Sequence, residues 1–178
     1  MSKIGKKNIN VPKDSSIKIE GSNLTITGPK GTKKLNINDK IFSSKLVENS
    51  FELKPLKKDV DKKTSIMWGT YRSLIFNAVT GVSKGHEKIL ELSGVGFRAN
   101  LKGEFLNLQI GYSHDVNFKI PKEIKITVEK QTLIKINGVD KDLVSKTASD
   151  IKSLKPVEPY KAKGCLLYTS DAADDGLC

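Results

Sequence analysis

VPKDSSIKIEGSNLTITG (Val11–Gly28) and IPKEIKITVEKQTLIKING (Ile120–Gly138) are two segments of one chain that follow the same pattern. Each begins with an apolar residue, proline, lysine and an acidic residue, and then alternates apolar and polar residues on both sides of a short polar turn. Alternation with a period of two predicts strands with one buried face. We interpret the segments as equivalent β-hairpins of a duplicated domain. Chance is the alternative, because alternating strands resemble one another.

Two amphipathic helices support the duplication. Apolar residues recur at steps of three and four, which predicts helices over about 62–80 and 141–154. Asp61 and Asp140 stand where N-terminal caps are expected, and Gly81 and Lys155-Pro156 stand where the helices should end.

Short strands, separated by glycines, complete each half of the chain. They are expected at 34–37, 51–53, 88–92, 105–110 and 116–120. The predicted fold class is α+β, a tandem duplication of a small domain with an antiparallel sheet packed on one helix. The expected divisions are 1–82 for an N-terminal domain, 83–164 for a C-terminal domain with an extended basic arm, and 165–178 for a tail.

The chain is strongly basic, with a formal net charge of +11 over 178 residues. Of its 20 acidic residues, Asp171, Asp174 and Asp175 lie in the tail, so residues 1–164 hold 31 basic and 17 acidic side chains, a net charge of +14. Such a balance favours nucleic acid as the partner, ahead of an anionic membrane surface. A merely lysine-rich surface is the remaining alternative. The start of the chain lacks an apolar run, so we expect no secretory signal and no membrane association.

No residue pattern predicts catalysis. The histidines are His86 and His114, and Ser113 beside His114 is a poor nucleophile–base pair, because neighbours in a strand point to opposite faces. An enzyme using Ser113, His114 and Asp115 is the weakest alternative. Metal-binding and nucleotide-binding motifs are absent from the sequence. We therefore expect no enzyme activity, no cofactor, no metal and no small-molecule substrate.

Three segments are candidates for contact with nucleic acid. GPKGTKK (28–34) could meet phosphate, or be a solvated hairpin tip. SGVGFRANLKG (93–103) sets Phe97 beside Arg98 and Lys102, although Phe97 could equally belong to the core. KPVEPYKAKG (155–164) contains prolines that oppose a helix and alternates lysines with small residues, as in an extended arm along phosphates; a disordered tail is the alternative.

These segments carry a family resemblance. MSKIGKK, PKGT, GVGFRA followed by LKG, GYSH and PVEPYKAKG occur in order over residues 1–164 and resemble ribosomal protein L6 of the large subunit, in its bacterial form. Val157 and His86 depart from the family pattern. The resemblance implies a two-domain structural protein in the cytoplasm that binds large-subunit ribosomal RNA near the sarcin–ricin loop, where translation factors dock. Its implied partners also include neighbouring ribosomal proteins. A general nucleic-acid-binding module outside the ribosome is the alternative.

The resemblance also implies RNA-facing residues in three segments. They are Gly94, Gly96, Phe97, Arg98 and Lys102; Tyr112, Ser113 and His114; and Lys155, Pro159, Tyr160, Lys161, Lys163 and Gly164.

The end of the chain departs from the resemblance. From Cys165 it reads CLLYTSDAADD, where the family continues with an isoleucine or similar residue and a basic tail. The six residues Cys-Leu-Leu-Tyr-Thr-Ser match the in-frame translation of a transposon-type sequencing adapter. We interpret 165–178 as a translated adapter fused to a truncated gene, and expect it to have no strand pattern and no partner in the body. A genuine variant tail is the alternative.

Overall fold

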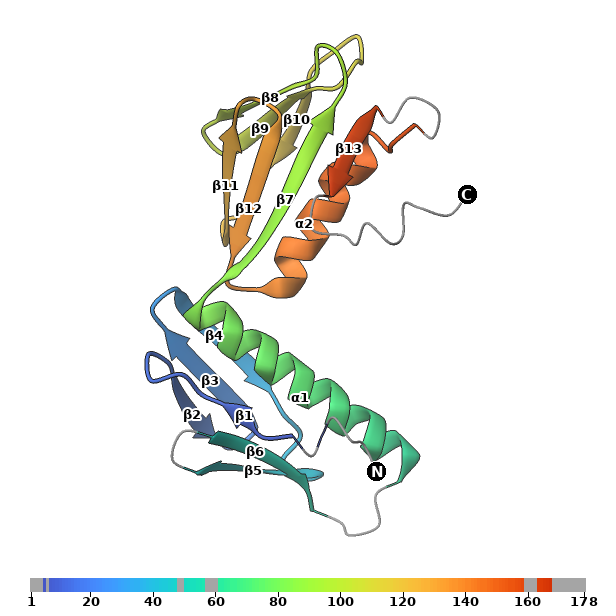
Figure 1. Cartoon of the computed structure of the whole chain (residues 1–178). Helices are drawn as coiled ribbons and strands as arrows, with labels where there is room; N and C mark the ends of the chain where they lie inside the picture. Colours follow the sequence, from blue (N-terminus) through green and yellow to red (C-terminus); the bar gives the residue numbers. More distant parts are fainter. Residues whose placement is uncertain (1–4, 6, 48–49, 57–60, 159–162, 168–178) are drawn as a thin grey trace. The chain divides into compact units, whose positions relative to one another are not determined.

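The computed structural model describes residues 5, 7–47, 50–56, 61–158 and 163–167, and it divides the chain into two compact units, Met1–Gly85 and His86–Cys178 (Figure 1). Each unit combines antiparallel sheets with one helix. The α+β duplication predicted from the sequence is therefore confirmed. The division falls after Gly85, three residues beyond the expected boundary between 82 and 83.

The first unit contains two three-stranded sheets and one long helix. Its elements are β1 (Ile9–Asn10), β2 (Ser16–Glu20), β3 (Asn23–Gly28), β4 (Gly31–Asn36), β5 (Phe42–Val47), β6 (Ser50–Pro55) and α1 (Lys62–Ser83). The strand orders are β2-β3-β4 and β1-β6-β5. The helix packs on β3, β4 and β6, and encloses a core that includes Phe51 and Ile75.

The second unit repeats this plan with one further strand. Its elements are β7 (His86–Ser93), β8 (Arg98–Lys102), β9 (Phe105–Gln109), β10 (Val116–Lys119), β11 (Ile124–Glu129), β12 (Leu133–Gly138), α2 (Lys141–Leu154) and β13 (Gly164–Leu167). The strand orders are β10-β9-β8 and β11-β12-β7-β13. The helix α2 packs against β7, β12 and β13 (Figure 1).

The two segments quoted at the outset are hairpins, but they are not equivalent ones. β2 and β3 begin the sheet β2-β3-β4, whose counterpart is β8-β9-β10, whereas β11 and β12 correspond to β5 and β6, the hairpin that precedes the helix. The matching of Val11–Gly28 with Ile120–Gly138 was therefore wrong, although the duplication is real. Period-two alternation reports which face of a strand is buried, and it does not report the position of the strand in the sheet.

The helix caps are confirmed, and one predicted helix end is wrong. Lys62 N–H donates to Asp61 Oδ1 at 2.8 Å, and Asp142 N–H donates to Asp140 Oδ1 at 3.2 Å. The helix α1 does not stop at Gly81 but continues to Ser83, where Lys84 and Gly85 donate to the Thr80 carbonyl. Those two bonds satisfy the helix end. The helix α2 ends at Leu154, immediately before Lys155-Pro156, as predicted.

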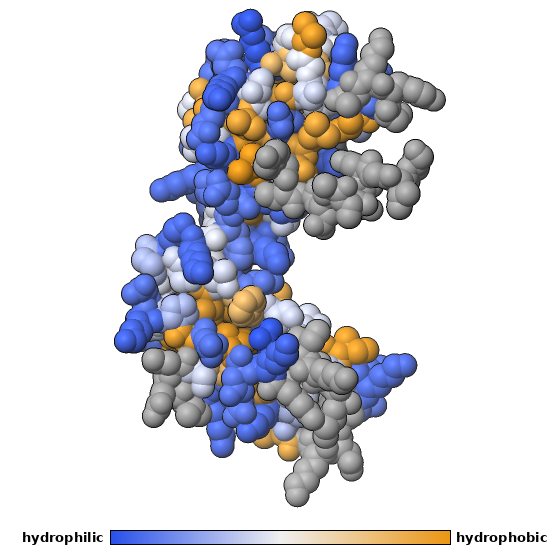
Figure 2. All heavy atoms as spheres, viewed as in Figure 1, coloured by the Kyte–Doolittle hydropathy of each residue, from blue (hydrophilic) through white to orange (hydrophobic). Residues whose placement is uncertain are grey.

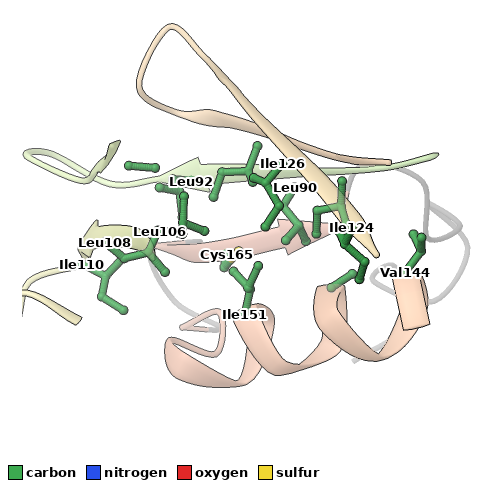
Figure 3. Packing of buried hydrophobic residues seen from close by; sticks show 14 residues of the cluster. Leu90, Leu92, Leu106, Leu108, Ile110, Ile124, Ile126, Val144, Ile151 and Cys165 are labelled. Carbon is green, nitrogen blue, oxygen red and sulfur yellow. The ribbon is translucent and has the colours of Figure 1, made fainter. Parts of the chain in front are cut away.

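The start of the tail is part of the second unit, contrary to expectation. β13 pairs antiparallel with β7, with Cys165 opposite Leu92 and Leu167 opposite Leu90. Cys165 is 1% exposed, and Figure 3 shows its side chain between the sheet and α2, close to Ile151. The edge of β7 offers backbone hydrogen bonds and the apolar face of α2 offers packing, so a short apolar segment is stabilised at this position. Composition alone does not reveal such a site, and the expectation for CLL was therefore wrong.

This packing predicts that removing residues 165–178 destabilises the second unit. Deleting them removes one core side chain and two half-buried leucines, so the free energy of unfolding in urea should fall by about 2–4 kcal/mol. Deleting only 168–178 keeps β13 and is the matched control, with stability unchanged. Equal stability of the two deletions would show that β13 contributes nothing.

The buried thiol predicts a decline of stability at high pH. Burial raises the pKa of Cys165 from 9.0 to about 11, against a smaller opposing effect of Lys152. Between these values the unfolded chain has lost the thiol proton and the folded chain has kept it, so the free energy of unfolding falls as pH rises. Cys165→Ala should show a smaller fall between pH 8 and 10.5. Parallel curves for the two proteins would contradict the assignment.

Candidate nucleic-acid interface

Three connecting segments of the second unit meet at one of its ends. β7 finishes at Ser93, which lies opposite Gly164 at the start of β13, so the loop after β7 and the loop before β13 are neighbours. The turn between β11 and β12 joins them, because Ala99 N–H donates to the Gln131 carbonyl at 2.8 Å. Parts of two predicted contact segments, 93–103 and 155–164, are therefore held by backbone hydrogen bonds beside the β11–β12 turn, which was not predicted to take part.

Tyr112 attaches a fourth segment, the loop between β9 and β10, to the same end. Its hydroxyl donates to the Leu154 carbonyl at 3.0 Å, which satisfies one acceptor at the C-terminus of α2. Lys155 Nζ lies 4.9 Å from the centre of the Tyr112 ring, within cation–π distance. Tyr112 is 49% exposed, so it links the two segments and still presents one face to solvent. We call this region the loop end; it comprises residues 94–98, 111–115, 130–132, 155–158 and 163.

Phe97 organises the first of these loops. The ring is half-buried and packs against the core of the second unit, as the core alternative foresaw. It also covers two glycines: a Cβ on Gly94 would lie 2.9 Å from the ring, and one on Gly111 would lie 3.2 Å from it. Any larger residue would displace the ring. Phe97 therefore holds two loops together, while Gly96 and Arg98 next to it are exposed.

Within the segment 155–164, the described residues before and after 159–162 are hydrogen-bonded to one another, which differs from the extended arm that was expected. Glu158 N–H donates to the Lys163 carbonyl at 2.9 Å, and Cys165 N–H donates to the Lys155 carbonyl at 3.2 Å. The buried Gly164 permits this closure, because a Cβ there would lie 2.6 Å from Val157 Cα. The predicted contact residues Pro159, Tyr160 and Lys161 lie outside the described residues.

The described part of the loop end is rich in cations. Arg98 and Lys163 are exposed, and Lys155 is half-buried beside Tyr112. Figure 2 shows hydrophilic residues over much of the visible surface of this unit. Lysines that converge from different loops can each meet a phosphate without requiring any base sequence.

Lys130 is an exposed member of the loop end that the sequence interpretation missed. It occupies the β11–β12 turn with a φ of +53°, beside Gln131. Its neighbour Glu129 is already engaged by Lys135, at 2.7 Å between Nζ and Oε1, so that carboxylate is partly compensated. The turn in EKQT was visible in the sequence, but its place beside the other loops follows only from the pairing.

Lys102 lies away from the loop end. It is the last residue of β8, opposite Phe105 across the hairpin turn, whereas Arg98 begins the same strand. At about 3.3 Å per residue, the two cations are separated by roughly 13 Å along β8. The segment 93–103 therefore contributes to two different places.

Ser113 and His114 occupy a loop and not a strand. The argument that their side chains point to opposite faces of a strand was therefore wrong. Both are exposed between β9 and β10. Within the described residues, neither side chain has a hydrogen-bond partner, and Asp115 instead accepts a bond from Gln109 Nε2 at 3.4 Å. The described residues contain no cluster of histidine, cysteine, aspartate or glutamate able to hold a metal, and no helix long and apolar enough to cross a membrane.

The turn GPKG in the first unit has a structural explanation. Lys30 N–H donates to the Val82 carbonyl at 3.0 Å, near the C-terminus of α1. A Cβ on Gly28 would lie 2.6 Å from the same oxygen, so glycine allows the hairpin to reach the helix. One of the backbone amides proposed for phosphate is therefore engaged within the protein.

Comparison with known proteins agrees with the duplication. The family described as Ribosomal protein L6 matches residues 11–85 and again 93–166, which is one match in each unit. The chain is similar to the large ribosomal subunit protein uL6 of Staphylococcus carnosus, at 47% identity over 92% of this chain and 90% of the relative. It is 46% identical to that of Geotalea daltonii, with coverage of 92% and 90%, and 43% identical to that of Phenylobacterium zucineum, with coverage of 92% and 91%. The chain therefore belongs to the ribosomal protein L6 family of bacterial type, whose members are structural constituents of the large ribosomal subunit and not enzymes.

Proposed function

We propose that the second unit clamps folded large-subunit ribosomal RNA through its loop end, in the neighbourhood of the sarcin–ricin loop. The observation that supports this role most directly is the convergence of Arg98, Lys130, Lys155 and Lys163 on loops that are tied together by backbone hydrogen bonds. Folded RNA is held mainly by its shape and phosphate positions. Cations on pre-arranged loops suit that task, because little ordering is needed on binding.

As a member of this family, the chain is a structural component of the large subunit of the cytoplasmic ribosome, with ribosomal RNA and other ribosomal proteins as partners. The nearness to docked translation factors is the finer part of the proposal, and it is supported by the family resemblance alone. The rival function, a nucleic-acid-binding module outside the ribosome, predicts no association with large subunits.

The origin of the chain end is a separate proposal. We propose that residues 165–178 are encoded by an adapter, with Cys165, Leu166 and Leu167 occupying a strand position that an apolar native segment would otherwise fill. Genomic reads across codon 165 test this origin. A contiguous gene that encodes the same residues in independent reads would make them a genuine variant end.

Co-sedimentation with large subunits tests the main function. The whole chain should sediment with large subunits in a gradient at physiological salt, and should protect a limited region of their RNA from chemical probing. Protection next to the sarcin–ricin loop supports the finer location, whereas protection elsewhere contradicts it. Binding to arbitrary duplex RNA with the same affinity as to large-subunit RNA would favour the rival function.

The phosphate clamp predicts a steep dependence of affinity on salt. Each lost lysine–phosphate contact should reduce the slope of log affinity against log salt by roughly 0.7 to 0.9, the values for single strands and for duplex DNA. We expect Lys155→Gln and Lys163→Gln each to reduce the slope by about one such contact. Lys40→Gln, an exposed lysine of the first unit, is the matched control and should leave the slope unchanged. A slope near zero for the original protein would refute the clamp.

Tyr112 predicts a different response, because it positions a loop and carries no charge. Tyr112→Phe removes the bond to Leu154 but keeps the ring under Lys155. Loss of one such bond is worth about 0.5–1.5 kcal/mol, so RNA affinity should fall by roughly 2- to 13-fold with the salt slope unchanged. Tyr71→Phe, in the first unit, should leave RNA affinity as it was. A reduced slope in Tyr112→Phe would mean that Lys155 had lost its phosphate.

A further inference from the structure

The sheet β10-β9-β8 has a second face that the loop end does not include. Its core face carries Ala99, Leu106 and Leu108, all buried. Because side chains alternate along a strand and directly paired residues share a face, the other face is composed of three cross-strand rows. These rows are Arg98 with Gln109; Asn100 with Asn107 and Asn117; and Lys102 with Phe105 and Lys119.

Phe105 is the unusual member of this face. It lies on β9, the central strand, and is 46% exposed. Register places it directly between Lys102 and Lys119. Phe105 does not occupy the buried side of the sheet, since Leu106 and Leu108 fill the central strand's positions there. The aromatic ring therefore presents a free surface between two cations.

Apart from Arg98, the remaining groups on this face are amides. Asn107 Nδ2 donates to Asn117 Oδ1 at 3.0 Å, and Asn100 stands on the other side of Asn107. Gln109 Nε2 donates to Asp115 Oδ2 at 3.4 Å, at the edge of the face, and Glu104 is exposed in the turn beside Phe105. Asn107 itself is only 6% exposed, whereas Asn100 and Asn117 on either side of it are exposed. The face thus combines positive charge, exposed amide groups and one exposed aromatic ring.

We infer that this face is a platform for an unpaired nucleotide of RNA, with Phe105 stacking on the base and Lys102 and Lys119 meeting the phosphates on either side. This inference rests on the proposed RNA-binding function and adds a second, chemically distinct contact to it. Paired side chains on neighbouring strands lie about 4.5–5.5 Å apart at Cβ, so both ammonium groups flank a base stacked on the ring. The exposed amides of Asn100 and Asn117 belong to the adjacent cross-strand row, within the reach of the edge of such a base.

The chemistry favours unpaired RNA over the other occupants. A duplex keeps the faces of its bases within the helix, so it would leave Phe105 without a partner, whereas single strands expose bases that stack on aromatic side chains. A surface for an acidic protein segment would use the lysines but has no need of the amide rows. The face is also continuous with the loop end through Arg98, which begins β8.

The test compares the binding of a ten-nucleotide single-stranded oligoribonucleotide to the whole chain and its variants. Phe105→Leu keeps an apolar side chain but removes the ring, and should weaken binding by roughly 5- to 150-fold, the range expected for one stacked base. Phe105→Tyr keeps the ring and should bind within about twofold of the original. Phe76→Leu is the matched control, because Phe76 is also 46% exposed but lies on α1 of the first unit.

The salt dependence separates stacking from charge. The double variant Lys102→Gln/Lys119→Gln should reduce the log–log salt slope by about 0.7 per lysine on a single strand, while Phe105→Leu should leave the slope unchanged. Binding of the oligonucleotide by Phe105→Leu at the original affinity would overturn the platform. The platform would also be overturned if Phe105→Leu lost as much affinity for a polyglutamate peptide as for the oligonucleotide. That result would mean that the face binds acidic protein segments.

Co-sedimentation of the same variants distinguishes this inference from the proposed function. Unchanged oligonucleotide binding by Phe105→Leu, together with normal co-sedimentation, overturns the platform and leaves the clamp standing. Failure of the original chain to sediment with large subunits overturns the clamp, whatever the oligonucleotide shows. Urea unfolding of Phe105→Leu and Phe105→Tyr verifies folding, and the exposed position predicts little change in stability.

Discussion

The pairing of β13 with β7 is the constraint on which the arrangement of the loop end depends. It places Gly164 beside Ser93, and so brings the loop before β13 against the loop after β7. It also connects β13 to the residues that follow α2, because Cys165 N–H donates to the Lys155 carbonyl at 3.2 Å. The same strand contributes Cys165 to the core between the sheet and α2. Three tail residues thereby connect core packing to the presentation of the loops.

The helices were predictable from the sequence because their signals are local. Apolar stripes and the caps Asp61 and Asp140 located both helices, with an error only at Gly81, where tertiary packing carries α1 two residues further. The equivalence of the hairpins was not predictable in this way. Many strands alternate, and what distinguishes β2–β3 from β11–β12 is which distant strand pairs beside them, which is a non-local property.

The candidate site shows the same division. Glycines, lysines and an aromatic residue marked the segments 93–103 and 155–164, but the structure separates Lys102 from Arg98 and adds Lys130 to it. Phe97 was a candidate contact residue because it precedes Arg98, but its ring packs against the core. Phe105 was not a candidate, because it lies in an ordinary strand pattern, yet it is exposed. The two lysines beside Phe105 lie on β8 and β10, so their position next to it depends on how these strands pair with β9. Cys165 was misjudged because a change of composition was taken for a change of structure.

The loop end and the platform would contribute different terms to RNA binding. Lysines on loops act as point charges on phosphates, so they supply affinity that salt weakens and that carries little base information. A ring with amides beside it acts on a base, and stacking depends weakly on salt. Because Arg98 belongs to both surfaces, one RNA strand leaving a folded region could pass from the clamp to the sheet without a gap. A structural protein arranged this way would hold the shape of folded RNA and also capture a base that the fold leaves unpaired.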